Sequence, residues 1–227
     1  MELKILSWNI WLDGNLGNII EFVRESDADI IGMQEVIPER EPNILESLAA
    51  LGYHHAFSTV MELRHDGKKM GNAVFSRFPI LSHDTTALSE EPRRLADHVV
   101  LDVNGESIHI FNTHIMHTHQ KQSDVQDSQI EKLLSLLPET RVLVMGDFNA
   151  TPESGVVRRM SEVLISTDPS NTPTWSMYPA GCHACDPQSV YTRLDYIFAS
   201  RDLATHSPAV GKSDASDHLP ISVTVSI

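Results

Sequence analysis

The chain has 227 residues, enough for one domain of ordinary size, and 41% of them are hydrophobic, enough to fill a core. Its 17 basic and 31 acidic residues give a formal net charge of −14, which argues against a nonspecific binder of duplex nucleic acid. The apolar runs are much shorter than a membrane span, and the N-terminus enters a strand pattern without a signal-peptide core. We therefore expect a single domain over residues 1–227, monomeric and cytoplasmic.

Hydrophobic periodicity predicts an alternation of strands and helices along the chain. Short apolar, β-branched runs are typical of strands, and apolar residues that recur every three or four positions are typical of amphipathic helices. Strands are predicted at 3–7, 29–34, 53–59, 72–76, 98–103, 107–113, 142–148, 193–199 and 219–227. Helices are predicted around 19–23, over 42–51 and 120–137, and directly after Thr151.

Local signals refine three of these elements. The pair Asn104-Gly105 between two strands is typical of a tight hairpin turn. Thr151 would cap the helix that follows it, with Pro152 at the first helical position. The helix over 120–137 would bury one apolar side against the rest of the molecule. That side is predicted to consist of Val125, Ile130, Leu133, Leu134 and Leu137.

A segment rich in Pro, Ser and Thr over 166–190 is predicted to be a loop long enough to be functional. Trp175 and Tyr178 in this loop could stack a nucleobase or could instead cover the core. Cys182 and Cys185 have the spacing of a metal or redox pair. A structural zinc site needs four ligands and the chain has no second cysteine pair, so we interpret them as two thiols in a loop.

The segment "GDFNA" follows the apolar run 142–144 and ends it with an acid, an aromatic residue and an amide. Successive side chains alternate between the faces of a strand, so Asp147 and Asn149 would project the same way and Phe148 would turn into the core. Their oxygens suit a hard cation or a polarised water. A simple turn is the alternative interpretation.

Polar residues also stand at the ends of other predicted strands, or inside them. In chain order the whole set is Asn9, Glu35, His114, Asp147, Asn149, Asp195, Asp217 and His218. Each has a structural alternative when it is taken alone; Asp195, for example, could pair with Arg193 inside the core. Together they predict a site, because functional residues of such sheet proteins gather at one edge of the strands.

Six motifs carry a resemblance to a known family: "LSWNIW", "MQEV", "FNTHI", "GDFNA", "RLDYIF" and "SDHLPI". In this order and at this spacing the chain resembles the endonuclease/exonuclease/phosphatase superfamily, the metal-dependent phosphoesterases related to deoxyribonuclease I, from near residue 3 to near residue 225. The resemblance implies a four-layer α/β sandwich, in which two mixed β-sheets pack face to face with helices outside.

The resemblance also implies a metal site. Glu35 would be the principal Mg²⁺ ligand, and Asn9 and Asp217 would help to complete the shell around the metal and the phosphate. Oxygen donors of this kind favour Mg²⁺, or Mn²⁺, over zinc.

The remaining residues would supply the chemistry. His218 resembles the general base or phosphate-polarising histidine of the family, and Asp195 resembles the carboxylate that fixes its tautomer. Asp147 would position or deprotonate the attacking water, a role that members of the family divide differently between it and His218. Asn149 would bind a non-bridging phosphate oxygen, and His114 would donate to the phosphate or the leaving group.

His114 places the chain within the superfamily. The motif "NTHI" resembles the deoxyribonuclease, deadenylase, phosphatase and sphingomyelinase branches rather than the lesion-specific endonucleases. In deoxyribonucleases a glutamate from the segment corresponding to 93–98 pairs with this histidine, whereas the chain has Arg94, Leu95 and Asp97 there. The orientation of His114 is therefore open. The basic stretches Arg93-Arg94 and 64–69 could face an anionic substrate or could be solvated loops.

The sequence thus predicts Mg²⁺-dependent hydrolysis of a phosphoester, with a phosphodiesterase or nuclease favoured. The substrate would be a short or single-stranded nucleic acid, a nucleotide-like small molecule or a lipid headgroup. The alternatives are a phosphomonoesterase, a sphingomyelinase-like lipid phosphodiesterase of the same fold, or a noncatalytic binding protein. A further alternative is a zinc-dependent hydrolase that uses the histidine cluster, His114, His117 and His119, together with Cys182 and Cys185.

Overall fold

The computed structural model describes residues 1–119, 121–175 and 191–227. The strands of these residues form two six-stranded sheets. The first sheet has the order β11-β12-β1-β2-β4-β3, and its strands are β1 (Glu2–Asn9), β2 (Ile30–Val36), β3 (His54–Glu62), β4 (Lys69–Ser76), β11 (Ala204–Val210) and β12 (Ile221–Ser226). The second has the order β5-β6-β7-β8-β10-β9, and its strands are β5 (Ile80–Glu90), β6 (Arg93–Val103), β7 (Glu106–His114), β8 (Val142–Asp147), β9 (Ile165–Ser166) and β10 (Asp195–Ala199).

Both sheets are mixed. Each contains one parallel pair, β1 with β2 in the first sheet and β7 with β8 in the second, and the other neighbours are antiparallel. Parallel neighbours need a long crossover connection. Helix α1 (Leu16–Ser26) lies in the first crossover and α3 (Asp124–Ser135) in the second. Because the strands of a parallel pair end at the same edge, each sheet brings two strand ends together.

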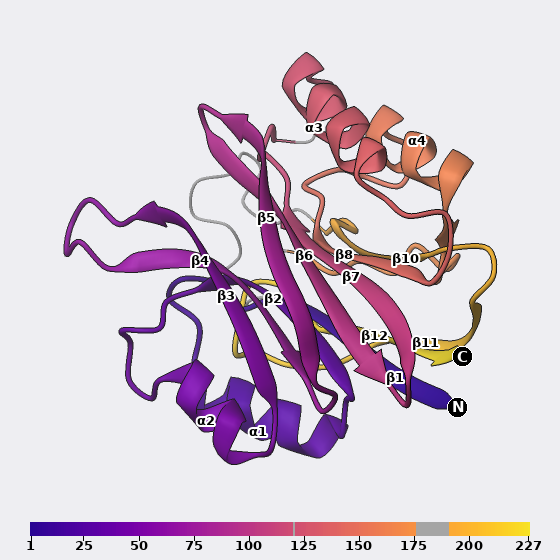
Figure 1. The fold of residues 1–227 in the computed structure, drawn as a ribbon. Coiled ribbons are helices and arrows are strands. Elements are labelled where there is room, and N and C mark those ends of the chain that lie inside the picture. Colours follow the sequence, from indigo (N-terminus) through magenta and orange to yellow (C-terminus); the bar gives the residue numbers. More distant parts are fainter. Residues whose placement is uncertain (120, 176–190) are drawn as a thin grey trace.

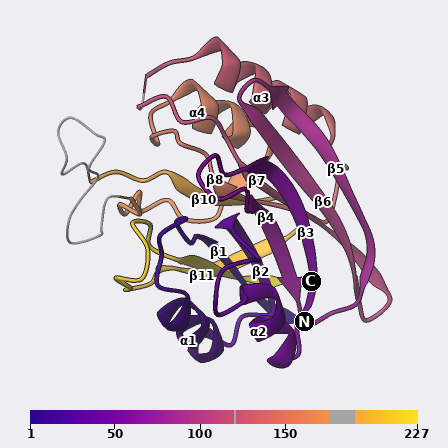
Figure 2. The ribbon, with the colours of Figure 1, turned by 90° about the vertical axis from the view of Figure 1, so that its left-hand side faces the viewer.

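Buried residues form three clusters that separate four layers. One cluster joins the inner faces of the two sheets, with Leu3, Ile30, Val99 and Leu143 among its members. A second joins the first sheet to α1 and α2 (Ile44–Ala50), and a third joins the second sheet to α3 and α4 (Gly155–Val163). Figures 1 and 2 show the two helix pairs on opposite sides of the paired sheets. The predicted sandwich of two mixed sheets with helices outside is confirmed.

The edge strands β5, β9 and β11 are not predicted by the sequence patterns. Most residues of β5 and β11 are exposed or only partly buried, so they lack the apolar runs that reveal the central strands. Strand β6 also begins at Arg93 instead of 98, because its first residues pair with β5. The predicted hairpin turn is confirmed: Asn104 and Gly105 both have positive φ, 56° and 88°, as a primed turn requires.

The predicted buried side of α3 is wrong in part. Val125 is 38% exposed, whereas Gln126 and Gln129 are buried together with Ile130 and Leu133. These four positions have the i, i+3, i+4, i+7 spacing of one helix face. The helix presents two glutamines to the interior because backbone groups there need partners, as described below.

The predicted start of α4 is also wrong. The helix begins at Gly155, and its cap is Ser154, whose side chain accepts a hydrogen bond from the backbone N–H of Val157. Thr151 instead opens a turn, in which its carbonyl accepts a hydrogen bond from the N–H of Ser154 at 2.9 Å. A preceding turn thus moves the helix start by one turn. Among the described residues, none of the helices is long and apolar enough to cross a membrane.

Candidate active site

The eight predicted site residues lie together at one edge of the two sheets. Each parallel pair delivers side chains from its strand ends: Asn9 and Glu35 from β1 and β2, and His114 and Asp147 from β7 and β8. In the second sheet the position of Asp147 is opposite both that of His114 and that of Asp195. Asn149, Asp217 and His218 reach the same place from the loops after β8 and before β12.

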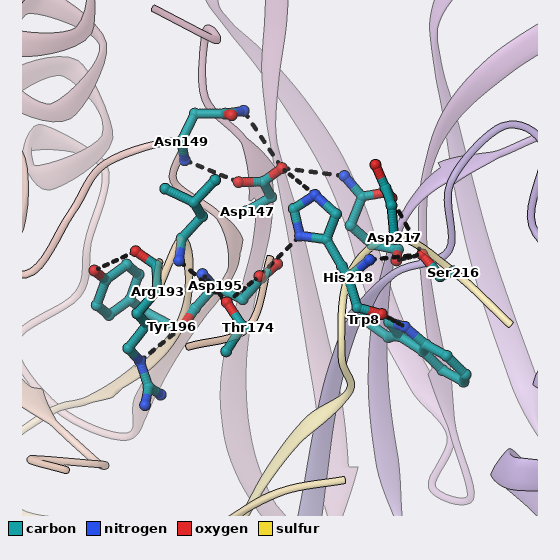
Figure 3. Close-up of polar contacts among 12 residues, drawn as sticks. Trp8, Asp147, Asn149, Thr174, Arg193, Asp195, Tyr196, Ser216, Asp217 and His218 are labelled. Atoms are coloured by element: carbon teal, nitrogen blue, oxygen red, sulfur yellow. Dashed lines mark hydrogen bonds and ion pairs between the residues drawn. The ribbon is translucent and has the colours of Figure 1, made fainter. Parts of the chain in front are cut away.

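The loop that carries Asp217 and His218 is anchored from two sides. The indole Nε1 of Trp8 donates to the carbonyl of His218 at 2.9 Å, and Ser216 Oγ donates to the carbonyl of Asn9 at 2.8 Å. The same Ser216 oxygen accepts from the N–H of His218 at 3.1 Å (Figure 3). These bonds fix the backbone of the loop against β1, so that the imidazole is directed toward Asp147.

A carboxylate orients the imidazole of His218. Nδ1 of His218 lies 2.8 Å from Oδ2 of Asp195, and the hydroxyl of Thr174 donates to the same oxygen at 2.6 Å (Figure 3). The structural alternative for Asp195 fails, because the guanidinium of Arg193 pairs with Asp168 at 2.5 Å and reaches only the backbone carbonyl of Asp195. Asp195 is thus available to fix the tautomer of His218.

Asp147 is the centre of the hydrogen-bond network. Its Oδ2 accepts from the amide Nδ2 of Asn9 at 3.1 Å and from that of Asn149 at 3.3 Å. The same oxygen lies 3.3 Å from Nε2 of His114 and 3.7 Å from Nε2 of His218. Asp147 is thus the described carboxylate that lies within 4.0 Å of His114.

The segment 93–98 does not supply a carboxylate to His114. Asp97 is opposite Asn112 in the ladder between β6 and β7, two residues before His114. Its carboxylate is buried and lies 3.8 Å from Nε2 of His83.

The "GDFNA" segment reaches this geometry by a turn. Gly146 has φ +144° and approaches β7 so closely that an added Cβ would lie 1.9 Å from the carbonyl oxygen of Thr113. The strand ends at Asp147, Phe148 is fully buried, and Asn149 has φ +47°, so the predicted extended conformation does not persist. The turn nevertheless brings Asn149 onto Asp147, since its N–H donates to Oδ1 at 2.8 Å.

Burial and opposite charges act against each other on His218. Burial alone would lower the pKa of His218, but the carboxylates of Asp195 and Asp147 outweigh it and raise the pKa to about 10. Burial raises the pKa of Asp147 to about 7, while the charge of His218 opposes that rise. The proton therefore resides on His218 at neutral pH, and Asp147 is a carboxylate of raised basicity.

His114 has the opposite tendency. Burial holds its pKa well below the ordinary value, and the positive charges of Arg94 and His218 lower it further. A neutral imidazole has one N–H donor and one acceptor nitrogen. His114 can thus take part in a hydrogen bond to substrate without adding charge.

Two overlapping donor sets could hold a cation. Burial raises the pKa of Glu35, and the negative charge of Asp217 raises it further, so these carboxylates lie close enough to repel each other. One ligand atom each from Asp147, Asp195 and His218 also lie within 4.8 Å of one another. Glu35, Asp217 and Asp147 do not form such a group among the described residues, but their oxygens are of the kind that a hard divalent cation binds, and a cation would offset the repulsion between Glu35 and Asp217.

Asn9 has a different place from the one that a metal ligand needs. Its amide nitrogen faces the carboxylates, donating to Oε1 of Glu35 at 3.2 Å and to Asp147. Its oxygen accepts from the N–H of Trp11 at 3.0 Å. Asn9 thus joins Glu35 to Asp147, and its oxygen would reach a cation only after the amide turned over.

The histidines after β7 do not form the alternative zinc cluster. Nδ1 of His117 lies 2.6 Å from Oδ1 of Asn149, and its Nε2 lies 3.1 Å from Nδ1 of His119. Within the ranges that the structure describes, no ligand group of three includes His117 or His119. His117 instead supports Asn149.

Trp175 lies against the site as part of its wall. The residue is only 5% exposed. The centroid of its ring lies 5.9 Å from the ring centroid of His117 and 6.2 Å from that of His218. This burial favours the covering role over an open platform for a nucleobase. Tyr178, Cys182 and Cys185 lie outside the described residues.

The sequence analysis missed the glutamines that support the site from α3. The side-chain amide of Gln126 donates to the carbonyls of Met116 and Asn149, at 2.6 Å and 3.1 Å. Gln129 accepts from the N–H of Met116 at 3.1 Å. Their signal was the spacing: both share a helix face with Ile130 and Leu133.

Comparisons with known proteins agree with this geometry. A model described as "Endonuclease/Exonuclease/phosphatase family" matches residues 6–218. A search of the curated proteins found no match.

Solved structures match over nearly the whole chain. An endonuclease/exonuclease/phosphatase from Beutenbergia cavernae has 23% identity and a TM-score of 0.81, over 99% of this chain and 71% of that one. The catalytic domain of human Nocturnin has 22% identity and a TM-score of 0.77, over 99% and 93%. A mannosyl-6-phosphatase from Bacteroides thetaiotaomicron has 20% identity and a TM-score of 0.74, over 99% and 100%. At these identities the similarity shows the fold.

Proposed function

Because the chain belongs to the endonuclease/exonuclease/phosphatase family, whose members hydrolyse phosphoester bonds, we propose that it is a phosphoester hydrolase that uses a divalent cation, Mg²⁺ first and Mn²⁺ second. The observation that carries the proposal is Oδ2 of Asp147, which lies 3.3 Å from His114 and 3.7 Å from His218 and accepts from Asn9, the partner of Glu35. A base, two imidazoles and a cation-binding carboxylate thus meet within one network.

The cation would be held by Glu35 and Asp217, with Asp147 beside them. Among the described residues, only Asp147, Asp195 and His218 form a group of three whose ligand atoms lie within 4.8 Å of one another. Nδ1 of His218 and Oδ2 of Asp195 already bond each other at 2.8 Å, so we propose Glu35 and Asp217 as the principal ligands instead. When bound, a divalent cation neutralises phosphate charge and makes the phosphorus more open to attack.

The protein's own groups would perform the remaining steps. Asp147, whose pKa is raised to about 7, takes a proton from the attacking water. The His218 imidazolium, oriented by Asp195, stabilises the negative charge that develops on the phosphoryl oxygens. His114 forms a hydrogen bond with the leaving oxygen, since its own charge is suppressed by burial.

For the substrate, we keep the proposal that the sequence favours, which is a phosphodiester. It would belong to a short or single-stranded nucleic acid, to a nucleotide-like molecule or to a lipid headgroup. A cavity of about 320 Å³ beside Asn149 supports a substrate that extends beyond its phosphate. Lys121 and Arg158 are among its lining residues and would favour an anionic extension. A cytoplasmic, monomeric protein with a single domain over 1–227 stays a prediction.

The test is hydrolysis of matched substrates, each with Mg²⁺, Mn²⁺, Zn²⁺ or EDTA. The panel is an aryl phosphodiester, an aryl phosphomonoester, single- and double-stranded DNA and RNA, and sphingomyelin. Asp147→Ala serves as the blank and Asp214→Asn, at an exposed acid three residues from Asp217, as the matched control. We expect turnover with Mg²⁺ in the wild type and the control only. Turnover in EDTA, or equal turnover in the blank, would refute the proposal.

A further inference from the structure

Arg94 lies at the same edge of the sheets as the site residues. It is the second residue of β6, which pairs with β7 so that Ala96 is opposite Thr113. The hydroxyl of Thr113 donates to the carbonyl of Leu95 at 2.9 Å. This bond ties the start of β6 to the end of β7, directly beside His114.

The charge of Arg94 interacts with the charged groups of the site. Burial lowers the pKa of Arg94, and the charges of Asp147 and Glu35 oppose that shift. In return the positive charge of Arg94 contributes to the lowered pKa of both His114 and His117. Arg94 thus interacts electrostatically with four groups of the site, and the β6–β7 register places its backbone beside the end of β7 that carries His114.

This guanidinium has no partner among the residues that the structure describes. Its Nε is shielded from solvent and makes no hydrogen bond, and Arg94 forms no ion pair within 4.0 Å with any described carboxylate. Withdrawing a cation from water is unfavourable unless it is paired. Arg94 is therefore placed to receive an anion that the described residues do not supply.

The predicted phosphate donor Asn149 is already engaged. Its amide nitrogen donates to the carbonyl of Ile115 at 3.0 Å and to Asp147 at 3.3 Å, while its oxygen faces His117. Asn149 thus stabilises the network, and Arg94 provides donors for a phosphoryl oxygen in addition to those of His218. Guanidinium groups suit this role because their planar N–H donors match two oxygens at once.

We propose that Arg94 binds non-bridging oxygens of the substrate's phosphoryl group, as the anion-binding residue of the site. This inference rests on the proposed function for the identity of the group that is bound. It also accounts for the departure from deoxyribonucleases at this segment: a cation that binds substrate occupies the region where they have a carboxylate that orients the second histidine.

The first test is direct binding of inorganic phosphate, measured by calorimetry in the presence of Mg²⁺. Arg94→Met removes the charge and keeps an unbranched apolar side chain, Arg94→Lys keeps the charge, and Arg93→Ala at the exposed neighbouring position is the matched control. We expect phosphate affinity to fall about tenfold or more in Arg94→Met, less in Arg94→Lys, and not at all in Arg93→Ala. Unchanged affinity in Arg94→Met would overturn the inference.

Thermal unfolding separates this role from a structural one. Because Nε of Arg94 is shielded from solvent and has no partner among the described residues, Arg94→Met should leave the melting temperature of the phosphate-free protein unchanged or raise it. A marked loss of stability in Arg94→Met without phosphate would indicate a structural role and refute the inference. A low, non-denaturing concentration of guanidinium should restore part of the turnover that Arg94→Met loses and should leave the turnover of Arg93→Ala unchanged. Failure to restore turnover in Arg94→Met would count against the inference.

The proposed hydrolase activity and the proposed role of Arg94 can be refuted independently of each other. Phosphate binding that depends on Arg94, in a protein that hydrolyses none of the test esters, would support the inference and refute the hydrolase. Metal-dependent hydrolysis with unchanged KM and phosphate affinity in Arg94→Met would support the hydrolase and refute the inference.

Discussion

At the scale of single residues, the positions of protons decide which group acts as the base. Asp195 and Asp147 flank the imidazole of His218, so one proton is shared among two carboxylates and a ring. The imidazole holds it because its pKa is raised to about 10, while that of Asp147 is raised only to about 7. Such a pair of shifts favours Asp147 as the base and His218 as the charge-stabilising group.

The pH dependence of kcat follows from this assignment. Activity should rise as pH increases through about 7, since Asp147 must lose its proton, and fall near pH 10, where His218 loses its own. In Asp195→Asn the alkaline limb should move to lower pH, because the carboxylate that most raises the pKa of His218 is gone. The measurement is a pH profile of both proteins. An alkaline limb that stays in place would contradict the assignment.

Gly146 is a residue-scale requirement of the site. Its φ of +144° is disfavoured for other residues, and a Cβ would lie 1.9 Å from the carbonyl oxygen of Thr113. We expect Gly146→Ala to lower the free energy of unfolding by about 2 kcal/mol or more. Chemical denaturation measures this loss. Gly105→Ala is the comparison, because Gly105 also has a positive φ but no atom lies within 4 Å of an added Cβ. An equal loss of unfolding free energy in both variants would show that close packing at Gly146 is unimportant.

At the scale of elements, α3 both closes a crossover and supports the loops of the site. Gln126 reaches the carbonyls of Met116 and Asn149, and Gln129 bonds the N–H of Met116. The side chains of the helix therefore hold the segment after β7 and the turn after β8 in fixed positions relative to each other. Apolar side chains at these positions would leave the loop backbone groups without partners.

Two neighbouring substitutions on α3 should have very different effects. Gln126→Ala leaves two backbone carbonyls without their donor and should cost about 1–3 kcal/mol of stability, with a loss of turnover. Val125→Ala, at a position that is 38% exposed, should change stability by less than about 0.5 kcal/mol. Denaturation and turnover of both variants check this. A larger loss of stability in Val125→Ala than in Gln126→Ala would support the buried apolar face that the sequence predicts, which includes Val125.

At the scale of the whole molecule, the site concentrates negative charge between the sheets of an already acidic chain. The formal net charge is −14, and Glu35, Asp147, Asp195 and Asp217 meet at one edge. Repulsion among carboxylates opposes folding unless a cation compensates it. The metal-free protein should thus be less stable than the metal-bound one.

Metal and pH should act on stability through Glu35. Burial and the charge of Asp217 raise the pKa of Glu35 in the folded protein above 4.5, its ordinary value. The contribution of Glu35 to the free energy of unfolding is therefore fully present below about pH 4.5 and is lost as pH rises through the raised pKa. At pH 8 in EDTA, Glu35→Gln should therefore be at least as stable as the wild type. Saturating Mg²⁺, at about 100 times Kd, should stabilise the wild type by about 2.7 kcal/mol.

The same Mg²⁺ should stabilise Glu35→Gln far less, because the variant lacks a charged ligand. Thermal unfolding at pH 4 and pH 8, with Mg²⁺ or EDTA, provides the comparison, and Glu46→Gln on α2 is the control for loss of a negative charge elsewhere. Equal stabilisation of wild type and Glu35→Gln by Mg²⁺ would place the cation away from Glu35.

The amino-acid sequence was enough to predict the central strands, the family and the eight residues that meet at the site. Apolar runs reveal strands that are buried on both faces, and polar residues that end such runs must leave the core together at a sheet edge. The edge strands β5 and β11 escaped because exposure removes the hydrophobic pattern. These are local properties, which a short stretch of chain expresses on its own.

Only the tertiary structure decided which polar groups pair. Asp195 bonds His218 rather than Arg193, and Gln126 replaces Val125 in the interior, because their partners come from distant parts of the chain. The same holds for Arg94, whose Nε finds no partner in the part of the chain that the structure describes. The physical reason is that hydrogen bonds and ion pairs depend on distances between atoms, and the packing of the two sheets sets those distances.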